Sequence, residues 1–553
     1  MILQRKSRSL VYMKNFPHIR FIIRYKVDLK SPGFFNSSGI RLIRRKALLI
    51  RRKALLIRRK ALLIRRKTLF IFLIITISIF VRLLLIVLRQ HPGGDEIWAV
   101  FLAQSSFKSI WLATLADLHG PFYFLFLHTL DLILPFHLNV FSLRIISLVF
   151  GIIASFGMWY LGNLILGKKF ALICFILSLF LPAFIFASIF ARYYSLLILL
   201  SVATIIDFVF FIKRGQIKYL ILLIVLSTIG VYTHYYFVLL PVSFMAFLML
   251  SKKYKKMISS GIFSLVSLAI LFAPGLYYLI TLPKPELIGR HANHILKLPA
   301  LVTTNIISGE TLVLLYLLGN PYVYLPIIII LSLLTIVLLI NGLRGIRGEL
   351  FWLFFSIIFV PSVAIIIFAY SIVPLFALGP LLIFSPALVV VIARGLEFEL
   401  KKSNILPLAF GLSIFASLIL FFYTSQVYAV LRADFRFFIN SFDDGDIVLH
   451  SHIGSFLIAS HYVGREANFE IFDTGSATAQ TSAGVGYKKT SVLDLPTQGG
   501  RIWYFESPLM TLEQANYVKA GLDKYLTLIY AQSFPKKGNE FKVDYYNVYL
   551  YSR

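Results

Sequence analysis

The sequence predicts a polytopic α-helical membrane protein with a small α/β domain at its C-terminal end. Of its 553 residues, 59% are hydrophobic and only 14% are charged, and the mean hydropathy is +0.83. Many uninterrupted apolar runs have the length of about 20 residues that a helix needs to cross a bilayer. From about Tyr428 the composition changes to that of a soluble domain. These features argue strongly against a soluble protein.

Residues 1–67 form a basic extension, which we expect to be cytoplasmic. They hold 21 Lys or Arg and one acidic residue, Asp28, and so contribute +20 of the net charge of +31. Within them, residues 44–67 repeat Arg-Arg-Lys-Ala-Leu-Leu-Ile three times and begin a fourth copy. Neither a helix nor a strand would separate the basic from the apolar positions. We interpret the repeat as a tandem duplication without a fold of its own, with a membrane-surface anchor as the alternative.

A transmembrane domain is predicted over residues 68–427. A basic segment that leads into the first apolar run marks the cytoplasmic side, so the first outer loop, residues 90–140, is predicted to be extracytoplasmic. The charge also favours contact with membrane lipids rather than with nucleic acid. The eleven predicted spans are residues 69–88, 141–163, 170–190, 193–212, 217–233, 234–250, 261–282, 322–342, 349–371, 375–395 and 406–427.

Two further apolar segments make thirteen spans the competing count. Residues 121–136 are short and contain His128 and Asp131, so we expect them to lie in the outer leaflet without crossing. Residues 302–318 are equally ambiguous. The single cysteine, Cys174, lies in an apolar run and permits neither an intramolecular disulfide nor a thiolate metal cluster.

Residues 428–553 are predicted to form the extracytoplasmic α/β domain. Apolar residues suit strands at 446–450, 501–505 and 541–551. A helix is predicted over residues 511–525, because Thr511 suits an N-cap and Glu513 lies in the first turn.

Four polar motifs at the outer ends of the apolar spans are the candidates for a site. Asp95 and Glu96 follow a Pro-Gly-Gly turn, and His119 precedes Gly120-Pro121. Arg192 and Tyr194 lie at the end of one span, and His234 lies within a run of tyrosines. An arginine at a membrane face needs an anion or a carboxylate as its partner, so Arg192 could pair with Asp95 or Glu96 or hold a phosphate. The ordered series of motifs argues for an enzyme.

Each motif also has a simpler explanation. Loop carboxylates are often merely exposed, and the tyrosines around His234 resemble an aromatic belt. Arg82 and Asp207 lie inside predicted spans near their ends, where snorkelling or a structural pair is the simpler expectation. Arg290, His291 and His294 have a spacing that a metal or phosphate site could use, although a solvated loop is the simpler alternative.

Taken in order, these motifs resemble the bacterial family 39 glycosyltransferases. The resemblance covers about residues 68–250. It rests on Asp95-Glu96, His-Gly-Pro-Phe-Tyr at 119–123, Leu143-Arg144, Ala-Arg-Tyr-Tyr at 191–194 and Tyr-Thr-His-Tyr at 232–235. The family includes relatives of protein O-mannosyltransferases and of lipid A aminoarabinose transferases, all with the GT-C membrane fold. Trp98 stands where the aminoarabinose transferases have an arginine.

The resemblance implies a sugar transferase that uses a polyprenyl-phosphate sugar as donor and a hydroxyl group as acceptor. Asp95 matches the catalytic aspartate and is expected to be the general base, with Glu96 orienting it. The donor phosphate is expected to contact the side chains at four positions: His119, Arg192, Tyr194 and His234. A divalent ion held by Asp95, Glu96 and His234 is left open.

Two other functions are compatible with the sequence. A flippase or transporter of lipid-linked oligosaccharides would also need many spans, but it would place its charges along a central path. A polysaccharide polymerase would need a large, arginine-rich outer loop late in the chain. The acceptor could be a protein, a glycolipid or a polysaccharide.

Overall fold

The fold is taken from a computed structural model. It describes residues 68–89, 92–116, 119–281, 321–370, 379–416, 418–419, 435–451, 453–464, 467–471, 488–490, 500–506, 512–534 and 546–552, together with residues 48, 49 and 55. The chain divides into two compact units, Met1–Ile75 and Thr76–Arg553. The repeats, apart from three isolated positions, and the loop with Arg290, His291 and His294 lie outside the described residues.

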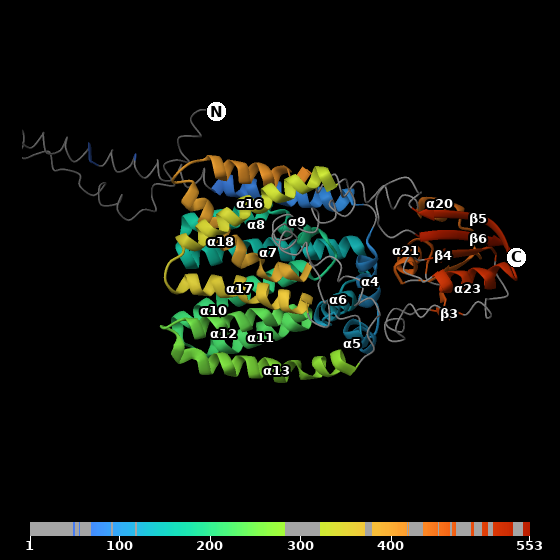
Figure 1. Ribbon diagram of the computed structural model, residues 1–553, viewed down its shortest axis with the longest axis horizontal. Helices are drawn as coiled ribbons and strands as arrows, with labels where there is room; N and C mark the ends of the chain where they lie inside the picture. Colours follow the sequence, from blue (N-terminus) through green and yellow to red (C-terminus); the bar gives the residue numbers. More distant parts are fainter. Residues whose placement is uncertain are drawn as a thin grey trace, which may run out of the picture. The chain divides into compact units, whose positions relative to one another are not determined.

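The second unit contains a bundle of long helices that run side by side, with shorter helices near one end of them (Figure 1). The short helices are α4 (Gly94–Ala103), α5 (Phe107–Ala116) and α6 (Phe122–Ile133). The other helices of the bundle and their connecting turns are α7 (Val140–Leu166), α8 (Lys168–Phe180), α9 (Pro182–Ile189), α10 (Tyr194–Arg214), α11 (Ile217–Thr233), η1 (Tyr235–Val238), α12 (Leu239–Leu250), η2 (Lys255–Met257), α13 (Ile258–Thr281), α16 (Pro321–Gly345), α17 (Glu349–Tyr370), η5 (Gly379–Phe384) and α18 (Ser385–Glu399).

Four helices among the described residues are long and apolar enough to cross a membrane alone, or five if the bent pair α8 and α9 is one span. Further apolar helices of 10–17 residues lie beside them, including Ile217–Thr233 and Ile405–Ala416. A multi-span helical membrane protein is therefore confirmed, whereas the count of eleven to thirteen spans stays a prediction. With 12 residues, α6 is only about 18 Å long, too short to cross the bilayer alone, and its place in the outer leaflet stays a prediction.

The predicted span at residues 170–190 is not straight. The helix ends at Phe180 and resumes at Pro182, with a bend of 54°. Proline has no N–H group to donate and its ring clashes with the preceding turn, which kinks or breaks a helix and accounts for the bend here. Arg192 therefore follows a short separate helix, α9.

Close packing of α16 and α18 depends on two glycines. A Cβ atom built on Gly395 would lie 2.1 Å from the carbonyl oxygen of Leu338, and one built on Gly342 would lie 2.0 Å from that of Val391. Small residues let helix backbones approach within a membrane, where van der Waals contact drives association. Neither position has room for a larger side chain.

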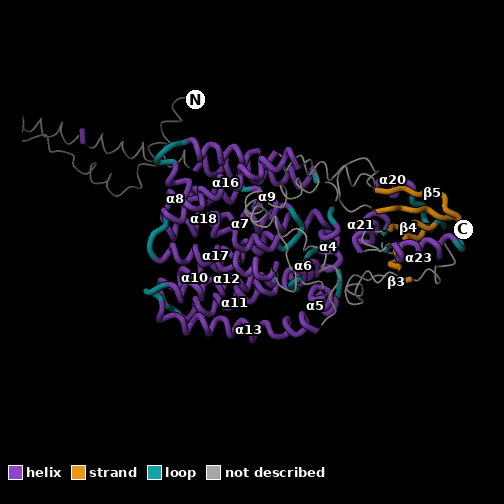
Figure 2. The backbone as a smooth tube through the Cα atoms, viewed as in Figure 1, coloured by secondary structure: helices purple, strands orange, loops and turns teal. Residues whose placement is uncertain are grey.

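The C-terminal domain contains a six-stranded mixed sheet (Figure 2). Its strand order is β3-β2-β1-β4-β6-β5, with β1 parallel to β2 and β4, and with β6 antiparallel to β4 and β5. Its elements are α20 (Phe435–Ser441), β1 (Ile447–His450), α21 (Ile453–Val463), β2 (Asn468–Ile471), β3 (Lys488–Thr490), β4 (Ile502–Glu506), α23 (Leu512–Asp523), β5 (Thr527–Phe534) and β6 (Tyr546–Ser552). The predicted α/β domain is thus confirmed, and β1, β4, α23 and β6 lie where the sequence placed them.

Both faces of the central strands are buried. Val448, Trp503 and Phe505 pack on one side of the sheet, and Leu449, Ile502 and Tyr504 pack on the other. Strands covered on both faces are continuously apolar, which explains the uninterrupted runs Ile447–His450 and Ile502–Glu506. At the start of β1, Asp446 accepts hydrogen bonds from Trp503 Nε1 at 2.9 Å and from the backbone N–H of Arg501 at 3.0 Å.

Candidate active site

Asp95 and Glu96 lie in the first turn of α4. The preceding Gly93 is extended, and its N–H group donates to Glu96 Oε2 at 2.9 Å. Acidic side chains are favoured in this turn because the free N–H groups give a helix N-terminus a partial positive charge. The two neighbouring carboxylates nevertheless have opposite surroundings: the side chain of Asp95 is 66% exposed, whereas that of Glu96 is completely buried.

Glu96 is held by donors from several parts of the chain. Arg144 on α7 donates to both carboxylate oxygens, from Nε to Oε1 at 2.9 Å and from Nη2 to Oε2 at 2.8 Å. The backbone N–H of Ala191 donates to Oε1 at 3.0 Å, and Arg89 Nη2 lies 3.4 Å from Oε2. Burial raises the pKa of Glu96, but Arg89, Arg144 and the Ala191 amide lower it further, so the pKa is held well below its usual range. Glu96 is therefore ionised, and its carboxylate connects the chain segments that contain Arg89, Arg144 and Ala191.

Arg192 connects Asp95 to His119. Its Nη2 atom lies 3.4 Å from Asp95 Oδ2 and 3.0 Å from His119 Nε2. Arginine donates hydrogen bonds and cannot accept them, so Nε2 of His119 is the acceptor. The imidazole is therefore neutral, with its proton on Nδ1.

The loop that carries His119 lies directly against the end of α11. A Cβ atom built on Gly120 would lie 2.1 Å from the carbonyl oxygen of Tyr232, so only glycine permits this approach. Tyr235 Oη donates to the carbonyl oxygen of His119 at 2.8 Å. The rings of Trp98 and Tyr193 lie 5.5 Å and 5.7 Å from the His119 ring, centroid to centroid. These contacts fix the imidazole beside Arg192.

His234 lies at the junction of α11 and η1, where the backbone leaves the helix. Its Nδ1 atom accepts from the N–H of Tyr236 at 3.3 Å, and its ring centroid is 6.5 Å from that of His119. The His234 side chain is buried, and its ring lies beside that of His119.

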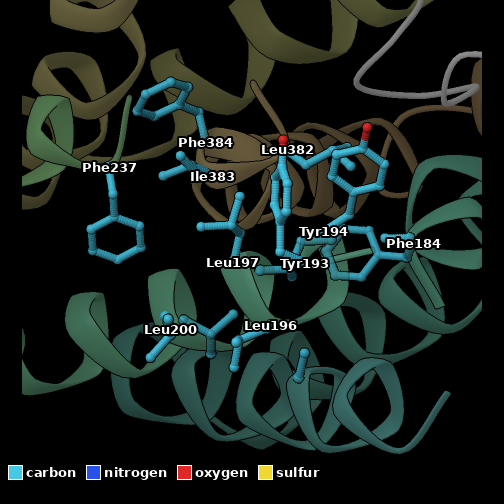
Figure 3. Close-up of a cluster of buried hydrophobic side chains, with 14 of the residues drawn as sticks. Phe184, Tyr193, Tyr194, Leu196, Leu197, Leu200, Phe237, Leu382, Ile383 and Phe384 are labelled. Atoms are coloured by element: carbon cyan, nitrogen blue, oxygen red, sulfur yellow. The ribbon is translucent and has the colours of Figure 1, made fainter. Parts of the chain in front are cut away.

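Tyr194 belongs to an apolar cluster, shown in Figure 3. Tyr193 and Tyr194 stand beside each other there, with ring centroids 5.0 Å apart, and both side chains are buried. Phe184 and residues 382–384 of η5 complete the cluster, which also contains Leu197 of α10. The structure therefore brings Asp95, His119, Arg192 and His234 together, while Tyr194 lies in the packed layer beside them.

The residues proposed for a metal ion do not fit one. Both oxygens of Glu96 already accept hydrogen bonds from N–H donors, and His234 Nδ1 is an acceptor for a backbone amide. Across the part of the chain that the structure describes, no group of three or more His, Cys, Asp or Glu side chains is arranged to hold a metal.

Residue-by-residue interpretation missed Arg89, Trp98, Tyr193 and the amide of Ala191 as members of the site. Arg144 entered only through the resemblance, as part of Leu143-Arg144. The available signal was the position of Arg89 and Arg144 at the ends of apolar helices, where each charge requires a partner. The partner, Glu96, lies 48 residues from Arg144 in the sequence.

The fold is of the GT-C type, the fold of a class of membrane glycosyltransferases. The family model for dolichyl-phosphate-mannose-protein mannosyltransferases matches residues 118–278, a segment that contains His119, Arg192 and His234. This segment is thus similar to the family that the motifs resemble. Comparison with curated protein sequences gives no match.

Two solved structures have a similar fold. ArnT from Cupriavidus metallidurans bound to undecaprenyl phosphate superposes with a TM-score of 0.55 at 11% identity, covering 87% of this chain and 98% of that chain. Its apo state gives a TM-score of 0.54 at 12% identity, covering 88% of this chain and 98% of that chain. The similarity extends over nearly all of ArnT, and at this identity it establishes the fold.

Proposed function

We propose that this protein transfers a sugar from a polyprenyl-phosphate donor to an acceptor hydroxyl group, with Asp95 as the general base. The observation that carries the proposal is the contact between the exposed carboxylate of Asp95 and the buried guanidinium of Arg192. A relative in fold, ArnT, has been observed with undecaprenyl phosphate bound, which supports the same class of donor here. The active site would lie at the extracytoplasmic face.

The chemistry needs a base and a cation close together. The acceptor hydroxyl attacks the anomeric carbon, the bond from that carbon to the phosphate oxygen breaks, and the hydroxyl proton passes to Asp95. Negative charge increases on the departing phosphate, where the Arg192 guanidinium can donate two parallel hydrogen bonds. Attack in a single step inverts the configuration of the anomeric carbon.

His119 and His234 have different parts in this proposal. Because His119 contacts Arg192 directly, it orients the guanidinium. His234 is buried behind it and holds the His119 loop through packing. Tyr194 supports the neighbouring Tyr193, and we no longer assign it to the phosphate.

The test is transfer of radiolabelled sugar from polyprenyl-phosphate hexoses and pentoses in membranes that contain equal amounts of each variant. We expect Asp95→Asn to lose transfer by about 100-fold or more, the contribution typical of a general base. Asp444→Asn is the matched control, because Asp444 is an exposed aspartate of the C-terminal domain. Full transfer by Asp95→Asn would remove Asp95 as the base. A wild-type protein that leaves every donor intact but moves lipid-linked sugar between leaflets would be a flippase.

A further inference from the structure

The break between α8 and α9 leaves backbone carbonyl groups without their helical donors. The carbonyl of Ser178 would normally bond the N–H four residues later, but that residue is Pro182. Ser155 Oγ on α7 lies 3.3 Å from the Ser178 oxygen and shares its proton between that oxygen and the Gly151 carbonyl at 3.0 Å. The carbonyl of Leu179 accepts from Ser78 Oγ at 3.1 Å and from Arg82 Nη1 at 2.8 Å. Side chains of neighbouring helices thus satisfy the broken backbone, as membrane burial requires.

Burying the charged guanidinium of Arg82 is an energetically costly way to supply a hydrogen-bond donor to the Leu179 carbonyl. It lies in the apolar helix Thr68–Leu88 and is fully buried, so it does not snorkel to the surface. Its Nε and Nη2 atoms have no hydrogen-bond partner among the residues that the structure describes. Buried N–H groups without partners destabilise a fold. An apolar side chain at a buried charged position is often neutral or stabilising, so stability alone does not explain this arginine.

The short helix α9 connects the break to the active site. All eight of its residues are buried, and a helix of this length spans about 12 Å. A Cβ atom built on Gly151 would lie 2.0 Å from Ser188 Oγ, so α9 touches α7 closely near the C-terminal end of α9. Immediately beyond α9, Ala191 donates to Glu96 and Arg192 contacts Asp95. The direction of α9 therefore determines where the Arg192 guanidinium lies.

We infer that Arg82 is a positioning residue for Arg192: by bonding the Leu179 carbonyl it fixes the angle at which α9 leaves the break. The activity measurements that test this inference rest on the proposed function. Among the described residues, the hydrogen bonds of Arg82 go to Ser78 and to the Leu179 carbonyl, so we expect its effect to pass mainly through α9.

The first test separates positioning from general stability. We compare Arg82→Met with Arg82→Lys, which retains a cation and a donor. For Arg82→Met we expect kcat/KM for sugar transfer to fall about 10- to 100-fold, the effect of misplacing a reacting group by about 1 Å, while the thermal unfolding midpoint in detergent stays equal or rises. Arg82→Lys should recover part of the activity. Parallel losses of activity and stability, or unchanged activity, would overturn the inference.

The second test asks whether the effect passes through Arg192. We combine Arg82→Met with Arg192→Ala and compare the double variant with both single variants. If Arg82 acts only by placing Arg192, its replacement should change the residual transfer less than about twofold once Arg192 is absent. Independent actions would instead multiply the two losses, and that result would contradict the inference.

A third measurement requires no transfer activity. Ser188→Cys in a Cys174→Ser background introduces a single buried thiol on α9. We expect a water-soluble maleimide to label it slowly, and several-fold faster after Arg82→Met. The native Cys174 of α8 is buried and should stay protected in a chain that carries Arg82→Met alone. Unchanged labelling at position 188, or equal exposure of Cys174, would overturn the inference. If the wild-type protein transfers no sugar, the proposed function fails and this labelling result still stands.

Discussion

Replacing Arg144 by Ala should destabilise the protein more than any single substitution at an exposed position. Arg144 supplies two charge-assisted hydrogen bonds to a carboxylate with no solvent exposure. Removing one partner of a buried ion pair costs about 3–5 kcal/mol, because the remaining charge stays buried. Glu96 keeps the amides of Gly93 and Ala191 and the nearby Arg89, so we expect the lower end, about 3 kcal/mol.

The assay is equilibrium unfolding in detergent of the wild type, Arg144→Ala, Glu96→Gln and the double variant. We expect a coupling energy of about 1–3 kcal/mol between the two positions, as for residues in direct contact. A coupling below about 0.5 kcal/mol would refute the assignment of Glu96 and Arg144 as one buried pair. Lys213→Ala is the surface control, since Lys213 is an exposed cation of α10 that bonds one backbone carbonyl.

The same pair predicts how stability depends on pH. The pKa of Glu96 is lowered in the folded protein from a reference value of 4.5. Below this value the unfolded chain binds a proton that the folded chain does not, so the stabilisation is present above pH 4.5 and is lost as the pH falls further. Glu96→Gln should flatten this part of the stability profile, and an unchanged profile would contradict the prediction.

Three further predictions concern packing and the C-terminal domain. Gly120→Ala places a methyl group against the Tyr232 carbonyl, so it should reduce sugar transfer about 100-fold. Gly411→Ala is the control and should leave transfer unchanged, because a Cβ atom at Gly411 has nothing within 4 Å. Gly395→Ala should force α16 and α18 apart and cost about 1–3 kcal/mol of stability, measured as an unfolding midpoint below that of Gly411→Ala. Burial lowers the pKa of His450 to about 3 in the folded protein, although a hydrogen bond to Asn468 acts in the opposite direction. The imidazole of the unfolded chain is protonated below about 6.5. The stability of the folded protein should therefore fall as the pH is lowered from 6.5 towards 3. Amide exchange of β1 in the full chain, corrected for intrinsic rates, should show this loss, and His450→Gln should remove it.

The class of fold could be predicted because it depends on local pattern. Apolar runs of bilayer length identify helices such as α7 and α10 without any knowledge of their partners. The break at Pro182 was predictable in principle from the proline, but the long apolar run around it favoured one straight span. In the C-terminal domain, β1 and β4 were predicted from an apolar pattern read as alternation, whereas both strands are buried on both faces; β2, β3 and the helix α21 were not predicted.

The site was predictable only in part because its contacts are long-range. Asp95, His119, Arg192 and His234 stand out as polar residues between apolar helices, and the structure brings them together. Glu96 has the same sequence context as Asp95, yet one is buried and the other exposed. That difference depends on Arg144 and Ala191, which lie 48 and 95 residues away. Helix periodicity carries no information about such pairings.

The contrast between the two carboxylates has a consequence for turnover under the proposed reaction. Asp95 and Glu96 together with Arg89, Arg144 and Arg192 give the empty site a net charge of +1, which matches a singly charged phosphodiester donor. Transfer leaves a lipid phosphate with two negative charges and a proton on Asp95. Because Asp95 is open to water while Glu96 is sealed, that proton can escape directly, and the site with its product then becomes net negative. Loss of the proton would thus weaken the binding of the polyprenyl-phosphate product and favour its release before the next donor binds.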